Sequence, residues 1–350
     1  MLESNNTNEG VHIMDLLQEI ALLEDESSAK NTQDSYEYAW TIWGNFVEWG
    51  KTHSASLADL DPENPTVEQV QAFVLWMQKY ARGGKGYAPA TIKARIAGLA
   101  SKLQELHPDE IPVTSNPAVK KIIKGVKRTA AKAGHKQRKM KAILPTTLEK
   151  MLAAGRIRYG ADSLITVRNE ALLTLGWNLG ARCSELVSLT RNNVQPIIKG
   201  GARVGYKFHW LSSKADKECE GMDKFIGVDN PFDPVARLEA WLEASQTKPS
   251  VNDSNWPLFR GVGTYNSIHN KPLHEKTILV LVRRYLSLAG IDPVGYGSHS
   301  LRAGVVTHLA SEGYTALEIQ AITGHKSAET VAGYVRRTGR DAIEIMKTGS

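Results

Sequence analysis

The chain has 350 residues, of which 42% are hydrophobic and 23% charged, and it is long enough to form two cored domains. No apolar stretch reaches the roughly 18–20 residues that a membrane-spanning helix needs, and the N-terminus lacks the basic and apolar segments of a secretion signal. The two cysteines, Cys183 and Cys219, exclude a disulfide framework and a four-cysteine zinc site. We therefore expect a protein that acts in the cytoplasm, where it is made.

The positive charge of the chain is unevenly distributed. The net charge is +6, but residues 1–30 carry seven acidic residues and one lysine, a balance of −6, which leaves +12 for the rest. Residues 120–141 contain ten Lys or Arg residues and no Asp or Glu. Such a block repels itself unless a polyanion neutralises it, so the pattern favours a nucleic-acid partner. The alternative is a solvated basic linker.

In the N-terminal half, the sequence predicts an acidic tail over residues 1–30 and a helical domain over residues 31–132. Asn64-Pro65 and Asn116-Pro117 each combine a capping residue with a proline suited to a first helical turn. A helix after the glycine-rich turn 82–86 has apolar residues at alternating steps of four and three, namely Ile92, Ile96, Leu99, Leu103 and Leu106. The tail is either frayed or a short amphipathic helix that docks on a neighbour through Ile13, Leu16, Ile20 and Leu23.

In the C-terminal half, the sequence predicts a basic linker over residues 133–144 and a larger, mostly helical domain over residues 145–350. Alternation of apolar and polar residues indicates a strand at 204–210, which forms a small antiparallel hairpin with 224–228. The fold class is therefore mainly α, with a mixed α/β second domain. Helices are expected at 146–155, 163–178, 183–190, 232–245, 273–289, 301–312 and 315–323.

Four short motifs in the second domain carry residues suited to phosphate chemistry. Arg182 and Glu185 lie in Gly-Ala-Arg-Cys-Ser-Glu-Leu, and Lys214 follows the expected strand. His299 and Arg302 form a His-x-x-Arg motif. His325 precedes Tyr334 by nine residues. Each motif alone is common on protein surfaces or in packing, so their joint occurrence and order carry the interpretation.

Taken together, these motifs resemble the tyrosine recombinase (phage integrase) family, in an arrangement closest to its Cre-like members. The resemblance covers residues 31–346, since YAPATIKARIAGL and NPAVKKIIKGVKR resemble the family's helical core-binding (SAM-like) domain. It implies that Tyr334 is the nucleophile, that Arg182, Arg302 and His325 stabilise the transition state, and that His299 assists Tyr334. Lys214 would be the general acid, with Lys217 as the alternative, and Glu185 would orient the site.

The residue types suit this reaction. Attack of an oxygen on a phosphodiester builds negative charge on the nonbridging oxygens, and fixed guanidinium donors stabilise that charge. The resemblance implies a site-specific DNA recombinase that forms a covalent 3′-phosphotyrosine and a Holliday junction without metal, ATP or another cofactor. A type IB topoisomerase-like nicking-closing enzyme and a non-catalytic DNA-binding protein of the same fold are the alternatives.

The expected partner is double-stranded DNA with an inverted-repeat site, in a bacterial or phage nucleoid and without membrane attachment. The family resemblance implies a homotetramer on two DNA sites, with a final helix at 340–348 that docks on a neighbouring subunit or caps its own domain. Basic residues on exposed helix faces and in the linker are the candidate DNA contacts, namely Lys93, Arg95, Lys124, Lys127, Arg128, Arg138, Lys139, His274 and Lys276.

Overall fold

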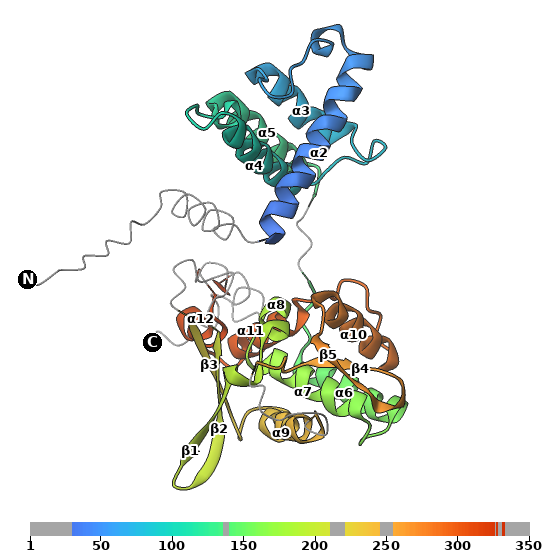
Figure 1. Ribbon diagram of the computed structural model, residues 1–350, viewed down its shortest axis with the longest axis vertical. Coiled ribbons are helices and arrows are strands. Elements are labelled where there is room, and N and C mark those ends of the chain that lie inside the picture. Colours follow the sequence, from blue (N-terminus) through green and yellow to red (C-terminus); the bar gives the residue numbers. More distant parts are fainter. Residues whose placement is uncertain are drawn as a thin grey trace, which may run out of the picture. The chain divides into compact units, whose positions relative to one another are not determined.

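The computed structural model describes residues 30–135, 140–210, 221–245 and 255–325, together with Ser327, Val331 and Ala332 (Figure 1). The chain divides into two compact units, Met1–Gln137 and Arg138–Ser350. The acidic tail and the final helix expected at 340–348 lie outside the described residues. Within the described parts, no helix is long and apolar enough to cross a membrane.

The regular secondary structure of the first unit is helical in its described residues. Its α-helices are α2 (Lys30–His53), α3 (Val67–Lys79), α4 (Pro89–Leu106) and α5 (Pro117–Lys132). Aromatic rings from α2 and α3 fill the core, with the Trp43 and Phe73 centroids 5.0 Å apart. Helices α2 and α4 approach closely at Gly98, where a Cβ atom would lie 2.6 Å from the Ala39 Cβ. The helical pattern predicted for this half is confirmed.

The helix starts show one agreement and one correction. At α5, the Asn116 Oδ1 accepts a hydrogen bond from the Ala118 N at 2.8 Å and Pro117 occupies the first turn, as the dipeptide predicts. At α3 the cap is Thr66, whose hydroxyl accepts from the Gln69 N at 3.3 Å. The Asn64 amide instead donates to the Asp61 carboxylate at 3.0 Å. The prediction of a cap at Asn64 was therefore wrong, because a threonine two residues later makes a capping box with Gln69.

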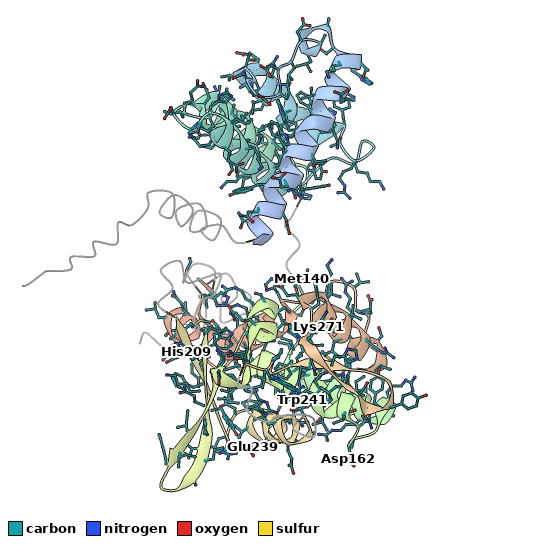
Figure 2. All side chains as sticks on the ribbon, viewed as in Figure 1. Met140, Asp162, His209, Glu239, Trp241 and Lys271 are labelled. Carbon is teal, nitrogen blue, oxygen red and sulfur yellow. The ribbon has the colours of Figure 1, made fainter. Side chains whose placement is uncertain are left out.

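The second unit is built around a buried helix, α7 (Leu164–Asn178). Twelve of its 15 residues are buried, so it is the central element of this core. The helices α6 (Pro145–Tyr159), α8 (Cys183–Ser188), α9 (Pro234–Ser245) and α11 (Ser300–Ser311) pack against it. Trp241 of α9, labelled in Figure 2, is fully buried and donates its indole N–H to the Leu258 carbonyl at 2.7 Å.

Two further helices complete the unit near the expected motifs. They are α10 (Glu275–Leu288) and α12 (Ala316–Thr323). Helix α11 packs closely on the segment before α6 at Gly304, where a Cβ atom would lie 2.0 Å from the Ile143 carbonyl oxygen. The backbone N–H of Ile143 also donates to the Ser300 carbonyl at 3.0 Å. These contacts fix the start of α11, which carries the His-x-x-Arg motif.

A three-stranded antiparallel sheet with the order β1-β2-β3 flanks the helices. Its strands are β1 (Val194–Lys199), β2 (Ala202–Trp210) and β3 (Met222–Gly227). In Figure 1 the β1–β2 hairpin extends away from the helices. Tyr206, Phe208 and Trp210 are buried, as the alternation in β2 predicts.

The sheets differ from the expected single hairpin in two respects. Strand β1 was not predicted because it is an edge strand with few buried side chains, and it contains Pro196, which lowers strand propensity. A second sheet joins β4 (Arg260–Val262) to β5 (Ile268–Pro272). These two strands are too short and irregular to produce a period-two pattern.

Candidate active site

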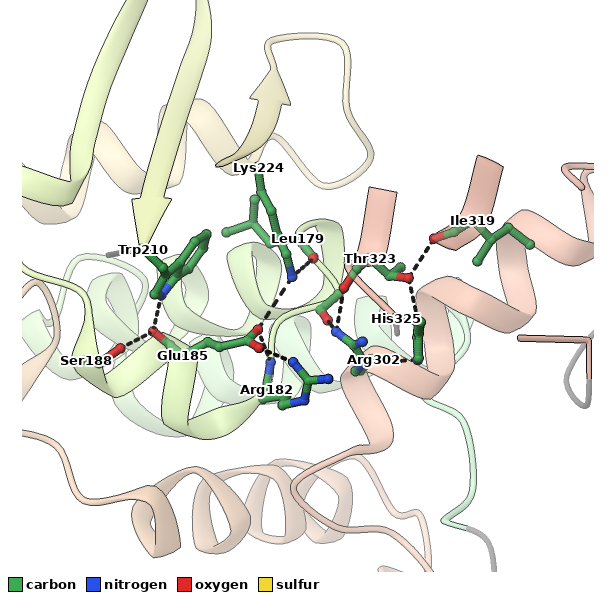
Figure 3. Close-up of polar contacts among 11 residues, drawn as sticks. Leu179, Arg182, Glu185, Ser188, Trp210, Lys224, Arg302, Ile319, Thr323 and His325 are labelled. Carbon is green, nitrogen blue, oxygen red and sulfur yellow. Dashed lines mark hydrogen bonds and ion pairs between the residues drawn. The ribbon is translucent and has the colours of Figure 1, made fainter. Parts of the chain in front are cut away.

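Five of the seven predicted catalytic residues are described, and all five lie in the second unit. Arg182 and Glu185 lie at the start of α8, His299 and Arg302 at the start of α11, and His325 just after α12. Figure 3 shows Arg182, Glu185, Arg302 and His325 in one cluster of polar contacts. The remaining predictions, Tyr334 and Lys214 with its alternative Lys217, lie outside the described residues.

Glu185 is the buried carboxylate of this cluster. Its side chain is 3% exposed, and it accepts a hydrogen bond from the Arg182 backbone N at 2.9 Å and pairs with the Arg182 guanidinium. Burial raises the pKa of Glu185, but the cations Lys224 and Arg182 outweigh burial, so the pKa lies below its ordinary value. The carboxylate therefore remains ionised and holds the Arg182 guanidinium.

Arg302 is almost completely buried and is held by backbone carbonyls. Its Nη1 donates to the Thr323 carbonyl at 2.7 Å and to the Gly180 carbonyl, and its Nε donates to His325 Nε2 at 3.2 Å. Gly180 has a φ of +51°, a conformation that side-chain-bearing residues rarely adopt. The turn between α7 and α8 thus presents a carbonyl that anchors a residue of α11.

His325 links Arg302 to the end of α12. Because the Arg302 Nε–H donates to Nε2, the imidazole proton lies on Nδ1 and is donated to the Thr323 hydroxyl at 2.5 Å. That hydroxyl donates in turn to the Ile319 carbonyl at 2.6 Å. Burial and the positive charges of Arg302, Arg182 and Lys224 lower the pKa of His325 to about 3. Without an anion in the site, His325 is therefore neutral and accepts a hydrogen bond.

His299 lies at the N-cap position of α11, close to both arginines. Burial lowers its pKa, and the neighbouring charges of Arg302 and Arg182 lower it further. A neutral imidazole at this point can accept a proton. The resemblance that assigns His299 to the activation of Tyr334 is compatible with this state.

Lys224 is a member of the cluster that the sequence analysis did not select. It lies in β3 with a side chain that is 2% exposed, and its Nζ donates to the Leu179 carbonyl at 3.0 Å and lies 3.5 Å from Glu185 Oε2. Period-two alternation places it on the same face of β3 as the buried Ile226. This alternation was the signal in the sequence that could have indicated a buried lysine. Trp210 lies against it and donates its indole N–H to the Glu185 carbonyl at 2.9 Å.

The described cluster has an excess of positive charge. Arg182, Arg302 and Lys224 bring three cationic groups against the single carboxylate of Glu185. Guanidiniums held in fixed orientations by carbonyls and a carboxylate are suited to bind phosphate oxygens. Cationic donors held in this way can stabilise negative charge on a phosphodiester.

The candidate DNA contacts occupy different environments. Lys93, Lys124, Lys127 and Arg128 in the first unit, and His274 and Lys276 at the start of α10, have exposed side chains. Arg95 instead packs within its own unit, with its guanidinium 4.3 Å from the centre of the Tyr38 ring and a hydrogen bond to the Ser35 carbonyl at 3.2 Å. Arg138 and Lys139 lie outside the described residues. All nine DNA contacts stay predictions.

Comparison with protein families gives a match to the Phage integrase family over residues 141–340. This range is more than half of the 350 residues and contains every predicted catalytic residue. Among the described members, Arg182 contacts Glu185 and Arg302 contacts His325. The match therefore covers the cluster and the segment that carries Tyr334.

Two curated relatives agree with this match. An integrase/recombinase XerD homologue of Selenomonas ruminantium is 26% identical over 325 residues, which cover 89% of this chain and 83% of that protein. Tyrosine recombinase XerD of Xanthomonas axonopodis pv. citri (strain 306) is 29% identical over 197 residues, which cover 55% of this chain and 57% of that protein. Since these relatives are Xer proteins, "Cre-like" describes the chain only loosely.

Solved structures share the fold at low sequence identity. XerH site-specific recombinase bound to difH substrate in a pre-cleavage complex has a TM-score of 0.60 at 17% identity, covering 90% of this chain and 78% of that chain. A lambda integrase dimer bound to a COC′ core site has a TM-score of 0.54 at 16% identity, covering 93% and 77%. The mainly helical fold with small antiparallel sheets is therefore confirmed. Because the family match spans more than half of the chain, the chain belongs to the phage integrase family and is a tyrosine-type site-specific recombinase.

Proposed function

We propose that the chain cleaves and rejoins DNA through a covalent 3′-phosphotyrosine at Tyr334, and exchanges strands between two sites through a Holliday junction. The observation that carries the proposal is the preformed pair of arginines. Arg182 is held by the buried Glu185, and Arg302 by the carbonyls of Gly180 and Thr323. Two fixed guanidiniums of this kind fit a phosphodiester whose nonbridging oxygens gain charge in the transition state.

The steps follow from the residue types. The Tyr334 oxygen attacks the phosphorus, a bond from Tyr334 to phosphorus forms, and the bond to the 5′-oxygen breaks. His299 accepts the phenol proton, while Lys214 supplies the proton that the departing 5′-oxygen needs. His325 becomes a donor to a nonbridging oxygen once Nε2 carries a proton. Rejoining is the reverse reaction, so the energy of the broken bond is retained in the phosphotyrosine and neither metal nor ATP is needed.

The proposed partner is double-stranded DNA with an inverted-repeat site, bound by a homotetramer on two such sites in the nucleoid of a bacterium or phage. Two structural neighbours, XerH bound to difH substrate and lambda integrase bound to a COC′ core site, support a partner that carries a specific site. The exposed lysines of α4 and α5 support it as well, since phosphate contacts dominate binding to DNA. The proposed division is an acidic tail at 1–30, a core-binding domain at 31–132, a linker at 133–144 and a catalytic domain at 145–350.

The test is covalent capture of DNA by Tyr334. The full chain is incubated with a library of nicked suicide duplexes that carry randomised sequence, and protein–DNA adducts that survive denaturant are recovered and sequenced. We expect adducts enriched in one inverted-repeat sequence with the wild-type protein, and none with Tyr334→Phe. Tyr314→Phe is the matched control, because Tyr314 is a tyrosine of the same C-terminal region that is 44% exposed.

Retained adducts in Tyr334→Phe would contradict the assignment of the nucleophile. Adducts without any shared sequence, together with relaxation of supercoiled DNA that lacks the enriched site, would instead indicate a nicking-closing enzyme. DNA binding without adducts in the wild-type protein would indicate a non-catalytic DNA-binding protein.

A further inference from the structure

Lys224 is a buried lysine whose ammonium faces the arginine cluster. The register of β3 with β2 pairs it with the buried Phe208, and its side chain is 2% exposed. Burial lowers the pKa of Lys224 to about 8; Glu185 opposes this shift, whereas Arg302 and Arg182 add to it. At pH 7 the side chain is therefore mostly protonated, although burial of that charge opposes folding.

The contacts of Lys224 link it to Arg182 through a shared acceptor and to Arg302 through adjacent carbonyls. Its Nζ donates to the Leu179 carbonyl, while the adjacent Gly180 carbonyl accepts from Arg302. Its other partner, Glu185 Oε2, also accepts from the Arg182 backbone N. Figure 3 shows Lys224 and Arg182 on the same carboxylate, and Lys224 beside the Leu179 carbonyl. The turn between α7 and α8 is therefore held by Lys224 at one carbonyl and by Arg302 at the next.

A purely structural role does not explain why an ammonium occupies this position. A methionine has a similar length and would fill the space between Trp210 and the turn without desolvation of a charge. What the ammonium adds is a third hydrogen-bonded cation on the network that orients Arg182. Catalysis by fixed donors depends strongly on such orientation, since a displacement of about 1 Å can cost on the order of 10²-fold in rate.

We propose that Lys224 is a positioning residue for DNA strand cleavage, which holds the Glu185 carboxylate and the Leu179 carbonyl so that Arg182 and Arg302 bind one phosphate. The inference rests on the proposed function and assigns to it a residue outside the motifs that identify the family. Lys224 acts through Glu185 and the turn. It is distinct from the general acid proposed at Lys214, because its ammonium is directed into the protein and is engaged by two internal acceptors.

The first test measures the rate of adduct formation at saturating DNA, with the duplex recovered by covalent capture as substrate. We expect Lys224→Met to slow adduct formation by on the order of 10²-fold, with an unchanged Kd for DNA. Lys224→Arg keeps a charged donor and is expected to recover part of the rate. A Lys224→Met rate equal to that of the wild type, with wild-type adducts present, would overturn the inference alone. Absence of wild-type adducts would overturn the proposed function and this inference with it.

The second test asks whether Lys224 acts through Glu185. In a double-mutant cycle, the Lys224→Met and Glu185→Gln changes should be strongly non-additive, because each breaks the same contact. We expect the double variant to lose no more rate than the slower single variant. Losses that multiply would show that the two residues act independently and would overturn the positioning role.

The third test separates positioning from proton donation. In a duplex with sulfur in place of the 5′-bridging oxygen, the leaving thiolate needs no general acid, because its pKa is far lower than that of an alcohol. We expect the Lys224→Met defect to persist on this substrate. Restoration of the wild-type rate would identify Lys224 as the proton donor and overturn the inference. Lys214→Met is the matched variant, for which the proposed function predicts restoration.

Discussion

Replacement of Glu185 by glutamine removes the only carboxylate of the described cluster while its shape is kept. The amide oxygen can still accept from the Arg182 backbone N, but the charge that balances Arg182 and Lys224 is lost. Loss of one partner from a buried ion pair typically costs about 3–5 kcal/mol. The side chain of Arg182 is 21% exposed, so water screens part of its loss.

The contribution of Lys224 to this loss has an upper limit. A lysine whose pKa is about 8 can release its proton when the carboxylate is removed. At pH 7 that release costs about 1.4 kcal/mol, the equivalent of a tenfold shift in protonation. Because water screens Arg182, the loss of its ion pair costs less than that of a fully buried pair. Together with the Lys224 contribution, we expect Glu185→Gln to lower the free energy of unfolding by about 2–3 kcal/mol. Denaturant unfolding of the DNA-free protein at pH 7 measures this value.

Glu170 provides a matched control for this prediction. It is also a buried carboxylate, 8% exposed, which pairs with Arg156 and Arg237, but it has none of the contacts of the arginine cluster described above. We expect Glu170→Gln to cost similar stability and to leave adduct formation at wild-type rate at a temperature where both variants are folded. Glu185→Gln should slow adduct formation by on the order of 10²-fold. Equal rate losses in the two variants, or no rate loss in Glu185→Gln, would refute the reasoning.

Two further predictions concern pH and packing. Below the unfolded pKa of 6.5, the unfolded chain binds a proton at His325 that the native protein excludes until about pH 3. Stability of the DNA-free protein should therefore fall by up to about 1.4 kcal/mol per pH unit as pH decreases through this window, an upper bound because the ring is partly exposed. Denaturant unfolding at several pH values measures how stability depends on pH. The lowered pKa of His299 contributes to the same dependence. If the dependence is unchanged in His325→Gln, His325 is not its source. Gly304→Ala should lower stability by about 1–3 kcal/mol, since its Cβ would lie 2.0 Å from the Ile143 carbonyl oxygen. Gly125→Ala in α5, with nothing within 4 Å, should raise stability by about 0.5–1 kcal/mol, and equal thermal midpoints for the two variants would contradict this account.

The helices could be predicted from sequence because local signals and burial agree there. At α5, Asn116-Pro117 marks the start and the apolar residues follow a helical period, so the element needs no tertiary information. The edge strand β1 lacks such agreement. Pro196 reduces its strand propensity, and pairing with β2, which cannot be read locally, determines its conformation. The start of α3 shows the same limit of local signals. Asn64 and Thr66 are both good capping residues, and the sequence alone did not show that Thr66 is the cap.

The candidate site divides in a similar way. Arg182, His299, Arg302 and His325 could be selected because they fall in ordered motifs, and the structure places them near one another. Lys224 could not be selected so easily, because a lysine in a strand is usually solvated. Its counter-ion comes from a helix 39 residues away in the sequence.

Arg95 shows a further limit of the helical period. The period places it away from the apolar stripe of α4, and its contact with DNA stays a prediction. In the structure its guanidinium packs on Tyr38 of α2. Long cationic side chains can lie along a neighbouring helix, so helical period alone does not determine their exposure.

The same positive charge that suits the cluster to phosphate also determines the state of His325 in its absence. Burial and three neighbouring cations make a proton on Nε2 unfavourable, and the Arg302 Nε–H occupies that nitrogen as a donor. A phosphate bound between the guanidiniums would reverse the electrostatic contribution, because an anion favours the protonated ring. It would also attract the Arg302 donors. On the proposed function, a bound phosphate would therefore raise the pKa of His325 and favour a proton on Nε2, from which the ring could donate to a nonbridging oxygen.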